Sequence, residues 1–271
     1  MDYINIRNVK VSRLIIGSNP FSGFSHQSPE VDLQMKRYFT TARIKTTLRE
    51  GEKLGVNTIL ARGDHHIVRM LMEYWDEGGT LQWFAQTCPE VGDHEANISR
   101  ASGGGAKACH IHGGVMDNFL AQNRIEEIPA VVELIRKHGM LAGIAGHNPA
   151  VFEWAEKNLD VDYYMCSYYN SAHRDQRAEH VSGMTEWFLE EDRKTMTTLI
   201  QKLSRPVIHY KIMAAGRNKP ADAFTCAARS MRPGDAVCVG VYPKDVPGML
   251  KEDVELLDKS LAACHTKASP R

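Results

Sequence analysis

The sequence has no excess of charge of either sign. Thirty-three basic residues balance thirty-three acidic ones in a chain of 271 residues. Without a net charge, a protein has no overall field that attracts nucleic acid or an anionic membrane. We therefore expect a small-molecule substrate and neither nucleic acid nor a membrane as partner, while a homo-oligomer remains open.

Long apolar runs and paired cysteines are also missing. No run of 18 apolar residues occurs, and residues 1–17 do not combine a basic segment, a long apolar stretch and a small-residue cleavage site. The six cysteines are scattered without a CxxC pair, which is typical of reduced thiols rather than of a disulfide framework. These features predict a soluble, cytoplasmic protein.

What the sequence does contain is a regular alternation of short apolar runs and amphipathic helical stretches. Apolar strands joined by helices indicate a parallel sheet covered on both faces, and eight such units predict a closed (β/α)8 TIM barrel of the α/β class. A single barrel domain over residues 1–271 fits this length. The predicted strands span residues 13–19, 57–63, 81–87, 108–114, 141–147, 162–170, 206–216 and 236–242. The weakest unit follows the third strand, where we expect only a short helix.

Polar side chains stand at or just after the ends of nearly all these strands, which is where barrel enzymes place their active sites. This density favours an enzyme. We expect Lys211, His112, His147 and Asp64 to be catalytic. The residues expected to bind substrate are Asn19, Arg62, Gln86, Arg217 and Tyr242. Two alternatives stay open, because Asn19 could form a turn and Asp64 could cap the following helix.

The stretch "ACHIHGG" (108–114) carries the most specific signal. With a period of two, His110 and His112 share one face of the strand, so His112 points up and inward. His147 ends the neighbouring predicted strand, and His66 follows the second one. Neutral imidazoles with a carboxylate or water suit Zn²⁺, Mn²⁺ or Fe²⁺. The sequence thus predicts a divalent metal on His112, His147 and His66; a metal-free acid/base role and structural burial are the alternatives.

The seventh predicted strand, "PVIHYKIMAAG", places His209 and Lys211 on one face, with Lys211 nearer the mouth of the barrel. A lysine that faces the interior needs a negative partner or has a lowered pKa. It could stabilise an oxyanion or form a Schiff base, and a lysine at the rim with its charge in water is the alternative without a catalytic role. Arg217, after Gly216, stands before the next helix and could bind an anionic group of the substrate.

The connection "NSAHRDQRAEHVSGMTEWF" (170–188) is about three times as long as an ordinary βα loop. It could be a lid over the site, a solvated insertion or an oligomer contact.

Several stretches resemble the aldo-keto reductase superfamily. "VKVSRLIIGSNPFSG" is similar to its opening strand, "ACHIHGGVMD" to the fourth strand with its catalytic histidine, "GIAGHNPAVFEWAEK" to the fifth and "DYYMCSYYN" to the sixth. The resemblance implies the barrel fold, with "YINIRN" as one arm of a hairpin that plugs the barrel bottom. It implies no complete catalytic set: the family's Asp, Tyr and Lys fall on Leu60, His65 and Gln86 or Thr87, and only His112 matches.

The nicotinamide contacts of that family are replaced as well. They fall on Ala145, Gly146 and Cys166, and the segment after the eighth strand lacks the arginine that holds the adenosine phosphate. NADP is therefore not the expected cofactor, and the chain resembles a divergent branch of the superfamily.

Taken together, these features predict an enzyme that applies acid/base chemistry, assisted by a divalent metal, to a small oxygenated substrate such as a sugar, keto sugar or hydroxy acid. An isomerase, epimerase or lyase is expected. An NADP-dependent reductase is the first alternative, and a non-catalytic sugar-binding barrel is the second.

Overall fold

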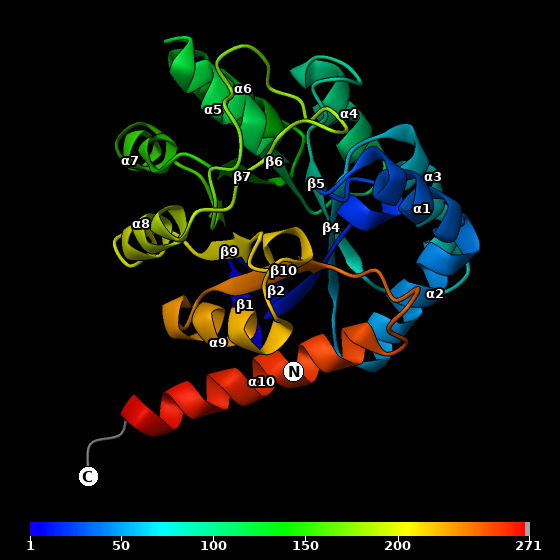
Figure 1. Ribbon diagram of the computed structural model, residues 1–271. Coiled ribbons are helices and arrows are strands. Elements are labelled where there is room, and N and C mark those ends of the chain that lie inside the picture. Colours follow the sequence, from blue (N-terminus) through cyan, green and yellow to red (C-terminus); the bar gives the residue numbers. More distant parts are fainter. Residues whose placement is uncertain (269–271) are drawn as a thin grey trace.

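Eight parallel strands close into a barrel in the computed structural model, which describes residues 1–268 (Figure 1). Their order around the barrel is β10-β3-β4-β5-β6-β7-β8-β9, so each strand lies beside its neighbour in the chain and the last closes on the first. The (β/α)8 barrel and all eight predicted strands are confirmed. The strands are β3 (Leu14–Gly17), β4 (Thr58–Arg62), β5 (Gln82–Gln86), β6 (Ala108–Ile111), β7 (Leu141–Gly146), β8 (Tyr163–Ser167), β9 (Val207–Tyr210) and β10 (Ala236–Gly240).

A two-stranded antiparallel hairpin precedes the barrel. It consists of β1 (Tyr3–Ile6) and β2 (Val9–Ser12), with Ile4 paired to Val11. Ile4, Ile6 and Val11 are buried and pack in the same cluster as the inward-facing side chains of the barrel strands. The hairpin therefore plugs one end of the barrel, as expected for "YINIRN", and the opposite end is left for a site.

Helices surround the barrel (Figure 1). Two of them were not predicted, α1 and α5, because α1 is mostly polar and α5 opens with two glycines. The short helix expected after the third barrel strand is present as α4. The α-helices are α1 (Pro29–Tyr38), α2 (Thr41–Lys53), α3 (His65–Asp76), α4 (His94–Gly103), α5 (Gly113–Ala121), α6 (Ile128–Lys137), α7 (Pro149–Asn158), α8 (Glu190–Ile200), α9 (Pro220–Ser230) and α10 (Met249–Ala268). Three short 3-10 helices are η1 (Asn19–Ser22), η2 (Ile125–Glu127) and η3 (Ala214–Gly216).

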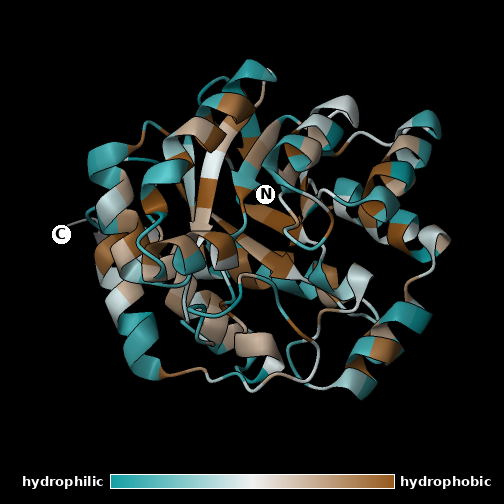
Figure 2. Cartoon of the chain, turned by 90° about the horizontal axis from the view of Figure 1, so that it is seen from above, coloured by the Kyte–Doolittle hydropathy of each residue, from teal (hydrophilic) through white to brown (hydrophobic). Residues whose placement is uncertain are grey.

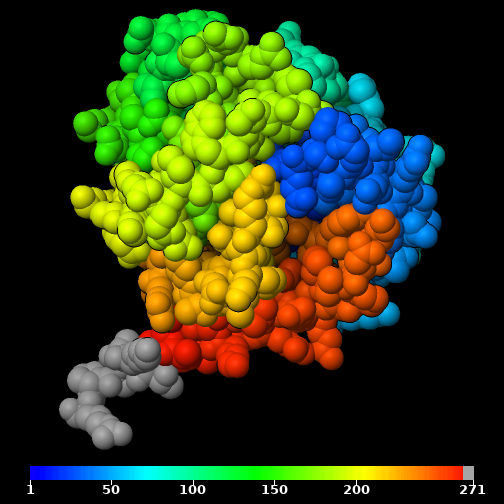
Figure 3. All heavy atoms as spheres, in the orientation of Figure 1, coloured from blue at the N-terminus to red at the C-terminus, as the bar shows by residue number. Residues whose placement is uncertain are grey.

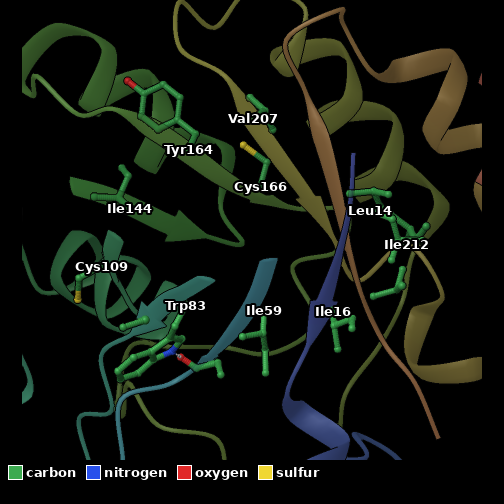
Figure 4. Packing of buried hydrophobic residues seen from close by; sticks show 14 of the residues in the cluster. Leu14, Ile16, Ile59, Trp83, Cys109, Ile144, Tyr164, Cys166, Val207 and Ile212 are labelled. Atoms are coloured by element: carbon green, nitrogen blue, oxygen red, sulfur yellow. Dashed lines mark hydrogen bonds between the residues drawn. The ribbon is translucent and has the colours of Figure 1, made fainter. Parts of the chain in front are cut away.

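The apolar core has two layers, which follow from the alternation of side chains along each strand. One set of strand residues points outward and packs under the helices, as Figure 4 shows for Ile59, Trp83 and Ile144. The other set fills the barrel interior with side chains such as Phe84 and Tyr163. Seen from above, apolar strands occupy the centre and the helices around them alternate polar and apolar residues (Figure 2). This packing fixes the strand ends that carry the site.

The six cysteines are all free, as predicted, and four of them are buried. None of the helices within residues 1–268 is both long enough and apolar enough to cross a membrane.

Candidate functional site

The mouth of the barrel holds a cavity of about 560 Å³. Loops from distant parts of the chain meet around it: residues 18–28 after β3, residues 211–219 after β9 and residues 241–248 after β10, together with the long connection 168–189 between β8 and α8. Figure 3 shows these segments meeting on one face of the molecule, with a hollow between them. A smaller space of about 50 Å³ continues from it toward β6 and β7.

Seven of the predicted site residues line these two spaces. They are Asn19, Arg62, Gln86, His112, His147, Lys211 and Tyr242. Side chains at the ends of seven barrel strands or in the loops just after them are therefore brought to one mouth, as the strand-end argument predicted. Asp64, His66 and Arg217 are not among the lining residues.

His147 is the best-organised side chain of this group. Its Nδ1 lies 2.6 Å from Oδ2 of Asp117, a buried residue of α5. Asp117 also accepts the backbone N–H groups of His147 and Asn148. Burial lowers the pKa of His147, and the charge and hydrogen bond of Asp117 only partly offset that effect. A neutral His147 that donates from Nδ1 therefore presents an unprotonated Nε2.

That Nε2 is 3.2 Å from the hydroxyl of Tyr210, the last residue of β9. Tyr210 lines both spaces at the mouth, and burial raises its pKa well above the usual value. Asp117, His147 and Tyr210 thus form a hydrogen-bonded chain that begins at the buried Asp117 in α5 and ends at the cavity wall with Tyr210. Sequence reasoning missed Asp117 and Tyr210.

Two glycines make this arrangement possible and explain why "GG" follows His112. A Cβ on Gly113 would lie 3.0 Å from His147 Cε1 and 3.0 Å from the Tyr210 hydroxyl, whereas a Cβ on Gly114 would lie 2.0 Å from the carbonyl oxygen of Ala178. The first glycine lets the histidine and tyrosine approach, and the second lets the connection 168–189 pack on α5.

His112 precedes α5 and lines the smaller space, as predicted. Its Nδ1 is buried and has no hydrogen-bond partner. Burial, together with the neighbouring His147 and Arg174, lowers its pKa well below the usual value. His112 is therefore a neutral imidazole beside the chain described above.

The predicted orientation of the seventh barrel strand is wrong in one respect. His209 does not share an inward face with Lys211: it points outward, is fully buried and contacts Tyr168 and Asp235. Strand alternation therefore points Tyr210 inward. Lys211 reaches the cavity because its own backbone is left-handed, with φ of 58°, a conformation that non-glycine residues seldom adopt.

Lys211 is held in the cavity wall by polar partners. Its Nζ donates to the Ser171 hydroxyl at 3.0 Å and lies 3.5 Å from Oε1 of Glu186. Burial lowers the pKa of Lys211, and the charge of Glu186 opposes that effect while Arg174 adds to it. The expectation that an inward lysine has a negative partner and a lowered pKa agrees with this geometry.

Arg62 and Asp64 are bound to each other. Arg62 Nε lies 2.9 Å from Asp64 Oδ2, and its Nη2 pairs with Glu90. Asp64 also caps α3 by accepting the N–H of Ile67. The capping alternative for Asp64 is thus what the structure contains, and Arg62 offers the cavity a guanidinium that is already paired.

His66 lies on the exposed surface of α3. The structure therefore does not bring it to His112 and His147, and the predicted three-histidine metal set is not assembled. The reason is local: α3 begins immediately after β4, at His65, and carries His66 away from the mouth.

Arg217 and Tyr242 hold the rim. Arg217 donates to the carbonyl oxygens of His26 and Ala214, and its guanidinium lies 4.5 Å from the ring centroid of Phe188. The Tyr242 hydroxyl is buried without a partner, in the wall of the larger cavity.

The connection 168–189 lies over the mouth. Ser182 is hydrogen-bonded to Asp32 of α1, and Asn118 of α5 donates to the carbonyl oxygen of Arg174 at 2.6 Å. His180 and Phe188 from this segment line the cavities. This placement favours the lid among the three interpretations of the segment.

Comparisons with known proteins support the fold. No protein-family model matches the sequence, and no curated protein matches it. Among solved structures, the barrel is similar to a Pseudomonas aeruginosa protein assigned to the aldo-keto reductases, at 15% identity and a TM-score of 0.64, covering 96% of this chain and 95% of that one. An aldo-keto reductase of Bacillus halodurans matches at 13% identity and a TM-score of 0.60, covering 99% and 96%.

The barrel is also similar to a truncated 3-deoxy-D-arabino-heptulosonate 7-phosphate synthase of Thermotoga maritima, at 14% identity and a TM-score of 0.55, covering 98% and 92%. At these identities the likeness concerns the fold. The resemblance to the aldo-keto reductase barrel expected from the sequence is confirmed at that level, and the same fold serves enzymes of other classes.

Proposed function

We propose that this protein is an enzyme that moves protons on a small oxygenated substrate, such as a sugar, keto sugar or hydroxy acid, as an isomerase, epimerase or lyase. The observation that carries the proposal is the chain Asp117–His147–Tyr210, which ends at the cavity wall near Lys211. A cavity of about 560 Å³ is large enough for such a molecule.

The proton-transfer groups have distinct roles in this proposal. Asp117 fixes the tautomer of His147, so that Nε2 can accept a proton from the Tyr210 hydroxyl. Tyr210 in turn exchanges a proton with the substrate. His112, neutral and close by, is a second group able to accept a proton. These roles need no nicotinamide.

Lys211 supplies positive charge where an enolate or alkoxide would form. An ammonium in a buried cavity stabilises such an oxyanion far more than it would in water. Its left-handed backbone and its contacts with Ser171 and Glu186 hold it in place for that role. Asn19 and Gln86, which line both spaces, are positioned to hold substrate hydroxyl groups.

The reductase alternative would need a nicotinamide to supply hydride. The residues that contact the nicotinamide in the aldo-keto reductases are replaced here by Ala145, Gly146 and Cys166. Cys166 packs outward under the helices. A non-catalytic sugar-binding barrel would need the same cavity but no proton-transfer chain.

A panel of aldoses, ketoses and hydroxy acids incubated with the protein in D₂O distinguishes these functions. Proton NMR should show deuterium entering a carbon next to a carbonyl, or new fragments in the case of a lyase. Binding of a panel member without exchange or cleavage would favour the sugar-binding barrel. Turnover that requires NADPH would favour the reductase.

A further inference from the structure

A second cluster of polar side chains lies beside the proton-transfer groups. It consists of His26, from the loop after β3, with His180 and Glu186 from the connection 168–189. One nitrogen or oxygen from each residue lies within 4.8 Å of the other two. Within the described residues no other set of three His, Cys, Asp or Glu side chains meets in this way.

The two histidines lie close to Glu186 and to each other, as the ligands of one ion would. His26 Nδ1 lies 2.7 Å from Oε2 of Glu186, and the two imidazole centroids are 4.4 Å apart. The Nδ1 of His180 is buried and has no hydrogen-bond partner, so one polar atom of the cluster is unsatisfied. A buried nitrogen without a partner is costly, and a bound ion would satisfy it.

The residue types of the cluster suit a cation. Neutral imidazole and ionised carboxylate are the forms of these side chains that bind metal. The cluster offers two imidazoles and one carboxylate, with one ligand atom from each close to the other two.

The surroundings hold these ligands in place. The backbone of His26 is left-handed, with φ of 57°, and its Nε2 lies 3.3 Å from the side-chain amide of Asn19. The other carboxylate oxygen of Glu186, Oε1, accepts the Ser171 hydroxyl at 3.0 Å. Partners of this kind orient ligands in metal sites. Lys211 approaches Oε1, so Oε2 remains on the side of His26.

We propose that His26, His180 and Glu186 bind a divalent transition metal ion, for which Zn²⁺ is the best fit. Two imidazoles and a carboxylate are an established zinc set that leaves a further position for water or substrate. Because His26 and His180 line the cavity, that position is accessible from it. The proposal does not depend on the proposed enzymatic function.

A bound ion would also hold the connection 168–189 closed over the mouth. Its ligands come from both sides of the mouth, so a bound ion would tie residues 168–189 to the loop after β3. The hydrogen bond between His26 and Glu186 already joins these two regions, and Ser182 joins the connection to Asp32 of the following helix α1. Metal binding would therefore protect the lid from proteases at its exposed residues, such as Arg177.

The test is a titration of the chelator-stripped full chain with Zn²⁺, followed by calorimetry, and with Co²⁺, followed by its visible absorption. We expect one ion per chain and a Co²⁺ spectrum with nitrogen and oxygen ligands. The variants His180→Ala and Glu186→Gln should each weaken binding by at least about 100-fold, because losing a ligand costs more than losing a partner of a ligand.

Two controls make the result specific. His173→Ala removes an exposed histidine from the same connection and should leave affinity unchanged. The double variant His112→Ala/His147→Ala should also keep the ion, which separates this site from the metal set predicted by sequence. Circular dichroism identifies any variant that fails to fold. If a variant does not fold, the Co²⁺ spectrum of the wild type is used instead, because a spectrum without nitrogen and oxygen ligands would contradict the proposed ligand set.

Trypsin gives a readout independent of affinity. Cleavage after Arg177 should slow when Zn²⁺ is added to the wild type and stay unchanged in His180→Ala. Binding that is absent in the wild type, or that is lost with His112 and His147 instead of His180 and Glu186, would overturn the proposal.

Discussion

The molecule contains two buried histidines that each bridge an aspartate and a tyrosine, and only one of them faces a cavity. At the mouth, His147 lies 2.6 Å from Asp117 and 3.2 Å from the hydroxyl of Tyr210. The tyrosine lines the cavity, so a proton taken from the substrate has a path to the imidazole.

The second set lies between the barrel wall and the helices. His209 is 3.3 Å from Asp235 and 3.0 Å from the Tyr168 hydroxyl. Arg232 also pairs with Asp235 at 2.9 Å, and none of these residues is among those lining the cavity. The same three residue types thus make a structural clamp here. Access to the cavity, and not the hydrogen-bond pattern, distinguishes a candidate site.

The largest expected effect comes from His147→Ala. Removing the central imidazole should lower turnover by about 10²–10⁴-fold, the usual contribution of general acid/base catalysis. Measured turnover of the substrate found in the D₂O panel, with circular dichroism to confirm folding, checks this. Full activity in a folded variant would place proton transfer elsewhere.

Next in size is Lys211→Met, which removes a positive charge that lines the cavity, whereas the arginine of the clamp around His209 is paired with Asp235 away from it. Turnover should fall by about 10²–10³-fold, as when an oxyanion donor is lost. Borohydride added during turnover should trap no adduct, because we assign Lys211 to charge stabilisation and not to a Schiff base. A reduced adduct on Lys211 in mass spectrometry would reverse that assignment.

The clamp of His209, Asp235 and Arg232 should make the free energy of unfolding depend on pH. Burial alone would raise the pKa of Asp235, but hydrogen bonds from His209 and Arg232 outweigh it and lower the pKa to about 2, from an ordinary 3.8. Its contribution to stability is therefore present above pH 3.8 and is lost as the pH falls toward 2. The loss is about 2 kcal/mol.

Urea unfolding across that range measures this contribution, with Asp235→Asn as the matched variant. The wild type should lose the extra stability in acid, whereas the variant should be less stable at neutral pH and vary less between pH 4 and 2. Parallel curves for the two proteins would show that Asp235 is not a clamp.

The smallest expected effect is a null result with NADPH. Because the family's nicotinamide contacts are replaced, fluorescence titration should show no saturable binding in the micromolar range. Saturable quenching, together with carbonyl-dependent oxidation of NADPH, would restore the reductase alternative.

The barrel could be predicted because its strands and helices are periodic. Each strand places its outward residues, such as Cys109 and Ile111, under helices and its inward ones in the barrel, so the pattern alone locates the strand ends. His112 and His147 were found at the mouth for that reason.

The rest of the candidate site depends on features that periodicity does not carry. Alternation holds within β9 and points Tyr210 inward. An inward His209 was predicted because Lys211 was counted in the same strand, and the left-handed backbone of Lys211 breaks the pattern there. Asp117 lies on α5, which begins with two glycines, and glycines do not predict a helix. His26 and Glu186 are 160 residues apart, and only the closed barrel brings their loops together.

In the proposed mechanism Tyr210 connects the substrate to His147, whereas Tyr168 serves only the clamp. The most direct test compares Tyr210→Phe with Tyr168→Phe in the D₂O exchange measured by NMR. Each change removes a tyrosine hydroxyl that is hydrogen-bonded to a buried histidine. We expect exchange to drop sharply in Tyr210→Phe and to persist in Tyr168→Phe. Equal exchange in the two variants would show that Tyr210 does not connect the substrate to His147.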